Sequence, residues 1–131
     1  VNGSVNALCA VGTTLYLGGA FTTFNNGTTN ITASYMCKFD TTSSSFSTLN
    51  TSFNGAVNAL FLIGTTLYVG GAFTTFNNGS GGILTNYICK YDTTTQSSFS
   101  KLSLLIVLIS SLLFGPNKPN THKSFVIDIQ T

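Results

Sequence analysis

Few side chains in this sequence can do acid, base or metal chemistry. The 131-residue chain has three acidic residues, Asp40, Asp92 and Asp128, no glutamate, and a single histidine, His122. Asp40 and Asp92 each follow an apolar stretch and precede Thr-Thr, a context typical of aspartates that hydrogen-bond their own backbone in a turn. Because these two aspartates hold equivalent positions, they do not predict the carboxylate pair of a glycoside hydrolase. We therefore expect no enzyme, no cofactor and no metal site.

The three cysteines also favour a structural interpretation. Cys9, Cys37 and Cys89 are too few and too widely spaced for the paired ligands of a zinc site. Cys37 stands in Tyr-Met-Cys-Lys-Phe and Cys89 in Tyr-Ile-Cys-Lys-Tyr, so we expect both to pack as small residues inside strands. A disulfide needs Cα atoms within about 7 Å, which equivalent strands of neighbouring units do not easily reach.

Two polar segments are the best candidates for binding a ligand. Residues 22–30 and 74–82 both contain Phe-Asn-Asn-Gly, in which the amides can hydrogen-bond a sugar or peptide while the ring stacks on it. The candidate residues are Phe24, Asn25, Asn26, Phe76, Asn77 and Asn78. The alternative is that Asn-Asn-Gly simply forms a turn with positive φ.

Five Asn-x-Ser/Thr sequons are candidates for glycosylation. They lie at Asn2, Asn26, Asn30, Asn50 and Asn78. Chance alone gives about three to four in a chain so rich in Asn, Ser and Thr, so they are a weak sign of secretion. A polar but uncharged surface points the same way, and we expect an extracellular or cell-surface location.

The composition favours strands and argues against nucleic-acid binding. Charged residues make up 6% of the chain, against roughly 25% in ordinary globular proteins. Thirteen glycines and 12% aromatic residues suit strands joined by many turns. The net charge of +2 is spread over five lysines without forming a basic stripe, so phosphate neutralisation is not expected.

The elements that carry these residues come from an internal repeat. Shifting the sequence by 52 positions gives about 28 identities in the first 44 residues, and residues 18–27 return unchanged as 70–79. Each unit reads as four short strands, apolar on both sides, which is typical of a sheet covered on both faces. The predicted strands are Val5–Val11, 15–21, 34–40 and 46–49, and then Val57–Ile63, 67–73, 86–92 and 99–102. The Gly-Gly pair late in the second strand indicates a close approach between strands or sheets.

These motifs resemble a known repeat family. Leu-Tyr-Leu-Gly-Gly, Tyr-Met-Cys-Lys-Phe-Asp-Thr-Thr and Phe-Ser-Thr-Leu resemble the kelch-type β-propeller blade, with Phe46 and Phe99 where Trp is usual. Leu-Tyr-Val-Gly-Gly-Ala-Phe-Thr-Thr-Phe-Asn is closer still to the repeats of fungal cortical polarity-marker proteins. The resemblance implies an all-β fold of two consecutive four-stranded antiparallel propeller blades and a scaffold that binds partners. A galactose-oxidase-like copper site needs two histidines, and this chain has one.

The sequence divides into three parts. Residues 1–52 are the first blade repeat, 53–102 the second, and 103–131 a divergent segment that begins with an apolar run, 103–114. About twelve residues are too short for a membrane-spanning helix, which needs about 20. The segment is a degenerate third blade, an apolar helix, or the product of a shifted frame or unspliced intron.

We therefore expect a non-enzymatic propeller segment that recognises a protein or glycan through its loops. One alternative is a fragment of a propeller enzyme whose catalytic residues lie in other blades, and another is a structural repeat without a ligand. Closed propellers have about four to eight blades, so two or three cannot form a ring. Flanking blades or self-association are the expected partners, whereas nucleic acid and membrane are not.

Overall fold

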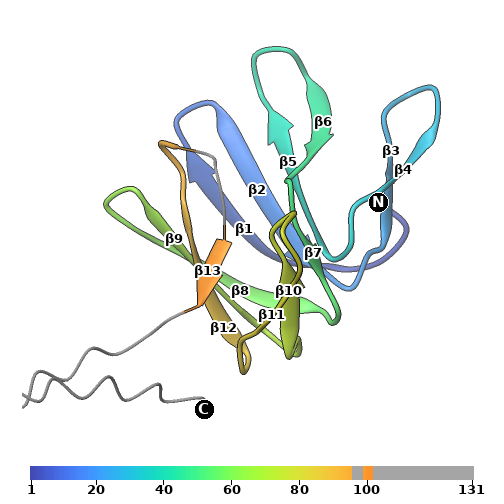
Figure 1. Cartoon of the computed structure of the whole chain (residues 1–131). Coiled ribbons are helices and arrows are strands. Elements are labelled where there is room, and N and C mark those ends of the chain that lie inside the picture. The colour runs from blue at the N-terminus through green and yellow to red at the C-terminus, as the bar shows by residue number, and fades with distance from the viewer. Residues whose placement is uncertain (96–98, 102–131) are drawn as a thin grey trace, which may run out of the picture.

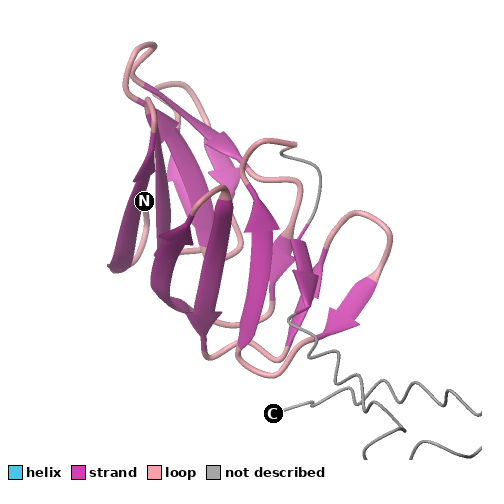
Figure 2. Cartoon of the chain, turned by 90° about the vertical axis from the view of Figure 1, so that its left-hand side faces the viewer, coloured by secondary structure: helices cyan, strands magenta, loops and turns pink. Residues whose placement is uncertain are grey.

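The structure is a computed structural model in which residues 1–95 and 99–101 are described. In these residues every element of regular secondary structure is a β-strand, and the strands form antiparallel sheets (Figures 1 and 2). The expectation of an all-β fold is therefore confirmed. The predicted third blade or helix at 103–131 lies outside the described residues.

The first repeat forms a four-stranded sheet, which we call sheet 1. Its strand order is β1-β2-β5-β6. The strands are β1 (Val5–Val11), β2 (Thr14–Gly19), β5 (Met36–Asp40) and β6 (Ser45–Thr48). Gly12 makes the tight turn between β1 and β2 with a φ of 58°, a conformation that glycine adopts without steric cost.

The second repeat forms sheet 2 with the same connectivity. Its strand order is β8-β9-β12-β13. The strands are β8 (Val57–Ile63), β9 (Thr66–Gly71), β12 (Ile88–Asp92) and β13 (Phe99–Lys101). Even the register is repeated, since Tyr16 lies opposite Lys38 and Tyr68 opposite Lys90. Each repeat unit thus contributes one four-stranded sheet.

The segments expected to be loops between the second and third strands fold into hairpins. In the first unit β3 (Thr23–Asn25) pairs with β4 (Asn30–Thr32). In the second unit β10 (Thr75–Asn77) pairs with β11 (Gly82–Leu84) and also with β7 (Ser52–Phe53), from the connection between the repeats. Polar composition hid these strands, since β3 and β10 each bury a single residue and β4 and β11 bury none.

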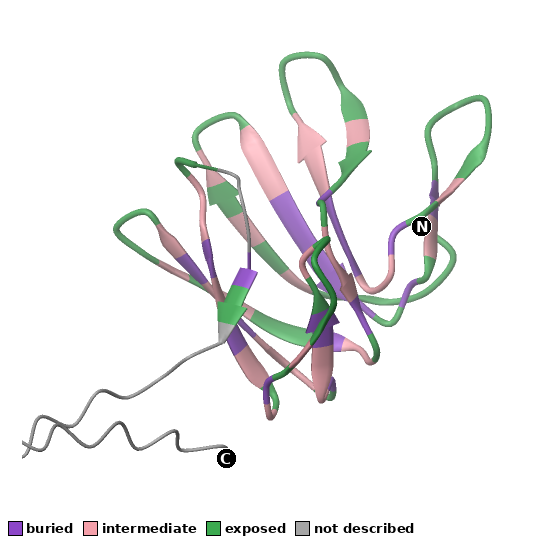
Figure 3. Cartoon of the chain, viewed as in Figure 1, coloured by how far each residue is buried: buried purple, intermediate pink, exposed green. Residues whose placement is uncertain are grey.

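The two sheets pack face to face. Tyr16 on β2 and Tyr91 on β12 meet edge to face, with ring centroids 6.0 Å apart. Between β1 and β8, Asn6 Nδ2 donates to Asn58 Oδ1 at 3.0 Å. We call the touching sides the inner faces of sheets 1 and 2, and the opposite sides their outer faces. Buried residues gather where the inner faces meet, while turns and hairpin tips are exposed (Figure 3).

The inner faces share one hydrophobic core, and a smaller core lies on the outer face of sheet 1. Members of the shared core include Tyr16, Met36, Val57, Leu67 and Tyr91. The smaller core contains Leu17, Phe21, Phe24, Ala33 and Cys37, because the β3–β4 hairpin folds over that side of the sheet. The hairpin of sheet 1 therefore packs on the outer face of sheet 1, whereas the hairpin of sheet 2 packs on the inner face of sheet 2. The inner face of sheet 2 also contacts sheet 1.

Candidate functional site

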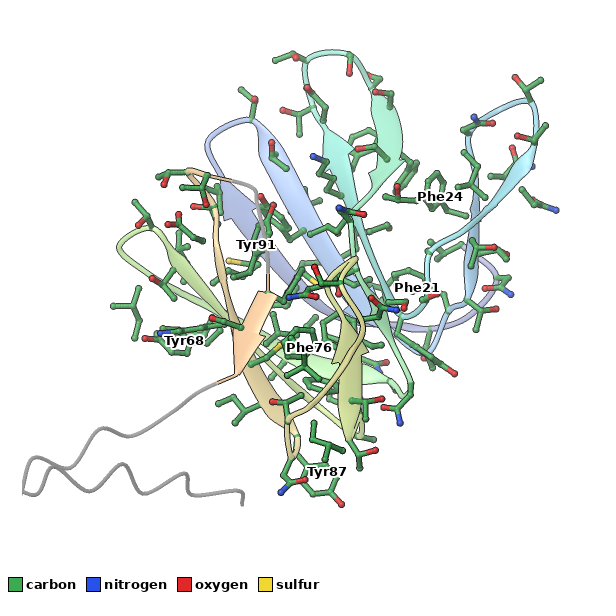
Figure 4. The ribbon with its side chains drawn as sticks, in the orientation of Figure 1. Phe21, Phe24, Tyr68, Phe76, Tyr87 and Tyr91 are labelled. Atoms are coloured by element: carbon green, nitrogen blue, oxygen red, sulfur yellow. The ribbon has the colours of Figure 1, made fainter. Side chains whose placement is uncertain are left out.

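The two hairpins carry the residues that the sequence singled out for ligand binding, and their aromatic rings are buried. Phe24 and Phe76 are each 1% exposed and belong to the two hydrophobic cores. Phe24 packs against Phe46 at a centroid distance of 5.6 Å, and Phe76 lies in the interior (Figure 4). The prediction that these rings stack on a ligand does not fit this geometry, because β3 and β10 turn each ring towards its sheet. The rings anchor the hairpins instead.

The tip of the first hairpin is built from asparagine side chains. Asn25 Oδ1 accepts a hydrogen bond from the Gly27 backbone N–H at 2.7 Å. Asn26 Oδ1 accepts from the N–H groups of Thr28 and Thr29 at 3.1 and 2.9 Å. Gly27 has a φ of 96°. These bonds stabilise the conformation of the turn.

The second hairpin repeats this turn with small differences. Asn77 Oδ1 accepts from Gly79 N–H at 2.8 Å, and Asn78 Oδ1 accepts from Ser80 N–H at 3.1 Å. Gly79 has a φ of 89°. Thr51 Oγ1 donates to the Asn77 carbonyl at 2.7 Å and ties this hairpin to the connection between the repeats. The turn interpretation of Asn-Asn-Gly therefore holds in both units, with the amide oxygens used inside the turn.

One asparagine fixes the base of each hairpin, and of the two only Asn2, as a sequon, stood out in the sequence. Asn2 Oδ1 accepts from the N–H groups of Thr22 and Thr23 at 2.8 and 2.9 Å. Asn54, 52 residues later, makes the same bonds to Thr74 and Thr75 at 2.9 and 3.0 Å. The recurrence of Asn-Gly at this spacing was the available signal. These clamps place the two hairpins equivalently on their sheets.

The sequons differ little in exposure. Asn2, Asn26, Asn30 and Asn50 are exposed, and Asn78 is partly buried. Asn2 already uses its amide nitrogen to donate to Thr22 Oγ1 at 3.0 Å, and Asn30 Oδ1 accepts from Asn25 at 3.0 Å. Asn50 lies near Gly79, in the connection beside the second hairpin. Glycosylation at these sites stays a prediction.

The two repeat aspartates are turn residues, as their context indicated. Asp40 Oδ1 accepts from the Thr42 N–H at 2.7 Å and from the Thr42 hydroxyl. Asp92 makes the equivalent bonds to Thr94 at 2.9 and 2.7 Å. These hydrogen bonds, the threonine hydroxyl first, stabilise the ionised form and lower the pKa of both carboxyls.

Burial keeps the thiols of Cys37 and Cys89 and the hydroxyls of Tyr16 and Tyr91 in their neutral forms at ordinary pH. Cys37 and Cys89 are buried free thiols, and burial raises the pKa of Cys37 to about 11 and that of Cys89 further. Burial also raises the pKa of Tyr16 and Tyr91, which share a hydrogen bond across the inner faces. A thiol with a raised pKa is a poor nucleophile, so both cysteines are packing residues.

Within the described part of the chain, no group of three or more His, Cys, Asp or Glu residues could hold a metal ion. Nor do residues 1–95 and 99–101 contain a helix long and apolar enough to cross a membrane. Comparison with protein-family models, with curated proteins and with solved structures finds no match for this chain.

Proposed function

We propose that the two units are consecutive blades of a β-propeller-type scaffold. The proposal adds that this non-enzymatic protein, secreted or at the cell surface, recognises a protein or glycan through its hairpin loops. The blade assignment draws support from the shared strand order of the two sheets and from the face-to-face contact between them. A propeller is built from such sheets, arranged with their inner strands side by side. Here β1 and β8 are the inner strands, joined by Asn6 and Asn58.

One observation carries the proposed role in recognition: the same exposed loop occurs in both units, and hydrogen bonds at its tip and at its base fix its conformation. Asx bonds fix each tip, an asparagine clamp fixes each base, and a buried Phe anchors each hairpin to its sheet. A loop that is already ordered loses little conformational entropy when it binds. The tips offer hydroxyl and amide groups without charge, which suits a neutral partner such as a glycan.

The test uses the full chain, produced in a host that does not N-glycosylate, on arrays of glycans and of peptides from secreted proteins. A Thr28→Lys/Ser80→Lys variant changes both tips but keeps both turns, because only the backbone N–H of each residue is used in them. The matched control is Thr13→Lys/Thr65→Lys, at the β1–β2 and β8–β9 turns, where each threonine accepts hydrogen bonds through its backbone carbonyl.

We expect the chain to bind one class of ligand, the tip variant to lose that binding, and the control to keep it. The proposal fails if the chain binds nothing on either array. It also fails if the tip and control variants behave alike.

A further inference from the structure

The outer face of sheet 1 is apolar and more exposed than its counterpart in sheet 2. Val57 and Leu67 on the inner face of sheet 2 are each 0% exposed, whereas Val5, equivalent to Val57, is 39% exposed and Leu15, equivalent to Leu67, is half-buried. Leu8 is paired with Leu17 on this outer face and is 57% exposed. The same residue types at the same positions therefore differ in burial only because sheet 1 covers one copy of the surface.

The outer face of sheet 2 shows the reverse difference. Phe61 and Ile63 on β8 are 66% and 58% exposed, whereas their equivalents on sheet 1, Cys9 and Val11, pack against the shared core. Tyr68 shares this face with Phe61, its partner in the β8–β9 register, and lies at the periphery of the molecule (Figure 4). Its counterpart Tyr16 is buried.

The two outer faces are consequently the two halves of the interface that already exists inside the chain. The inner face of sheet 1 contacts the inner face of sheet 2. The outer face of sheet 2 carries the residues equivalent to the inner face of sheet 1. The outer face of sheet 1 carries the residues equivalent to the inner face of sheet 2. Sheet 1 has no charged residue in the strand positions that form its outer face. The outer face of sheet 2 carries Lys90, and the internal interface already accommodates the equivalent Lys38, which is partly buried on the inner face of sheet 1.

We propose that the outer face of sheet 2 in one copy of this chain binds the outer face of sheet 1 in a second copy, in the manner of the internal interface. The glycine positions support this fit. A Cβ atom on Gly18 would lie 2.3 Å from Val57 Cγ1, so Val57 seats directly on Gly18. Gly70 is the equivalent of Gly18, and its nearest atoms for a Cβ are at 3.8 Å. This open place receives Val5 of the second copy.

Such an interface is heterologous, because different surfaces of the two copies meet. Repeated contacts of this kind close into a ring or continue as a filament. Asn58 of one copy then lies beside Asn6 of the next, which extends the amide contact along the inner strands. This inference rests on the burial difference between equivalent residues and is independent of ligand recognition by the hairpins.

The test blocks one face at a time in the full chain. Leu8→Glu places a carboxylate on the outer face of sheet 1, and Phe61→Glu/Ile63→Glu does so on the outer face of sheet 2. Each site is largely exposed within one copy, so the fold tolerates the change. The matched control is Leu84→Glu on β11, because Leu84 is 60% exposed but lies outside both faces.

In sedimentation velocity over a concentration series we expect the unmodified chain and the Leu84→Glu control to associate. Each blocked variant alone should associate more than about tenfold more weakly. A mixture of the two blocked variants should form a heterodimer and nothing larger, because one intact face of each kind remains. Gly70→Ala should also weaken association while circular dichroism shows an unchanged fold.

A chain that stays monomeric at every concentration overturns the proposal. So does association that survives both blocked variants, or a mixture in which no heterodimer forms. If the blocked variants lose their fold, the association of Gly70→Ala becomes the test. Unchanged association of that variant contradicts the proposed contact.

Discussion

A methyl group added at Gly18 should destabilise the chain, while the same methyl at the equivalent Gly70 should not. The Cβ of Gly18→Ala would lie 2.3 Å from Val57 Cγ1 and 3.0 Å from Val57 Cβ. Carbon atoms in contact prefer about 3.5–4.0 Å, so the sheets must separate by about 1 Å or Val57 must leave its rotamer. Overpacking of this kind costs about 1–3 kcal/mol.

At Gly70 the same methyl meets only ordinary contacts, at 3.8 Å from Ala59 Cβ and from the Tyr87 carbonyl. Gly70→Ala also restricts the unfolded chain, which stabilises the fold by about 0.4–1 kcal/mol where the backbone conformation suits alanine. The two variants should therefore differ by about 1.5–4 kcal/mol in the free energy of unfolding. Only the packing of sheet 2 on sheet 1 distinguishes the two positions.

The assay is equilibrium unfolding in urea, followed by tyrosine fluorescence, at concentrations where sedimentation shows a monomer. Gly19→Ala and Gly71→Ala serve as controls, because a Cβ there would lie 2.0 Å from the Ser4 carbonyl and 2.1 Å from the Ala56 carbonyl, each within its own unit. These two should destabilise the fold alike. Equal effects of Gly18→Ala and Gly70→Ala would refute the reasoning.

Three further experiments test the local structure. Asn54→Ala should lower the free energy of unfolding, measured in urea, by about 1 kcal/mol. In this variant two backbone N–H groups of the second hairpin lose the side-chain oxygen that accepts their hydrogen bonds and bond to water instead. Tyr87→Gly should raise the melting temperature by relieving an exposed residue with a φ of 69°, whereas Tyr35→Gly should lower it because Tyr35 packs on the shared core. The free energy of unfolding should fall as pH rises above the ordinary cysteine and tyrosine pKa values of 9.0 and 10.0, because burial raises the pKa of Cys37, Cys89, Tyr16 and Tyr91 in the folded state only. Unfolding curves between pH 8 and 11 test this, and Tyr91→Phe should make the decline shallower.

The repeat made most of the sheet architecture predictable. Short runs apolar on both sides placed β1 at Val5–Val11 and β8 at Val57–Ile63 with the bounds that the structure has. The turn roles of Asp40 and Asp92 and the burial of Cys37 were likewise readable from local context. Each of these properties depends on short-range chemistry, which a single unit already contains.

The hairpins and the way the units pack were not readable in the same detail. Phe24 and Phe76 sit among polar residues, and the sequence does not tell whether such a ring turns towards solvent or towards the sheet. The hairpin fold sets the direction of each ring, and the hairpin is stabilised by an asparagine about 20 residues away in the chain. Burial also differs between Val5 and Val57 although their local sequences agree, because it depends on which neighbour each sheet has.

The contact between the sheets is best tested by nuclear Overhauser effects in the isotope-labelled chain at a concentration where it is monomeric. The account predicts strong cross-peaks from the Val57 methyl groups to the Gly18 α-protons, and between the rings of Tyr16 and Tyr91. It also predicts that a soluble paramagnetic agent broadens the methyl signals of Val5 and leaves those of Val57 sharp. Missing cross-peaks together with equal broadening of the two valines would contradict the stacking of the two units.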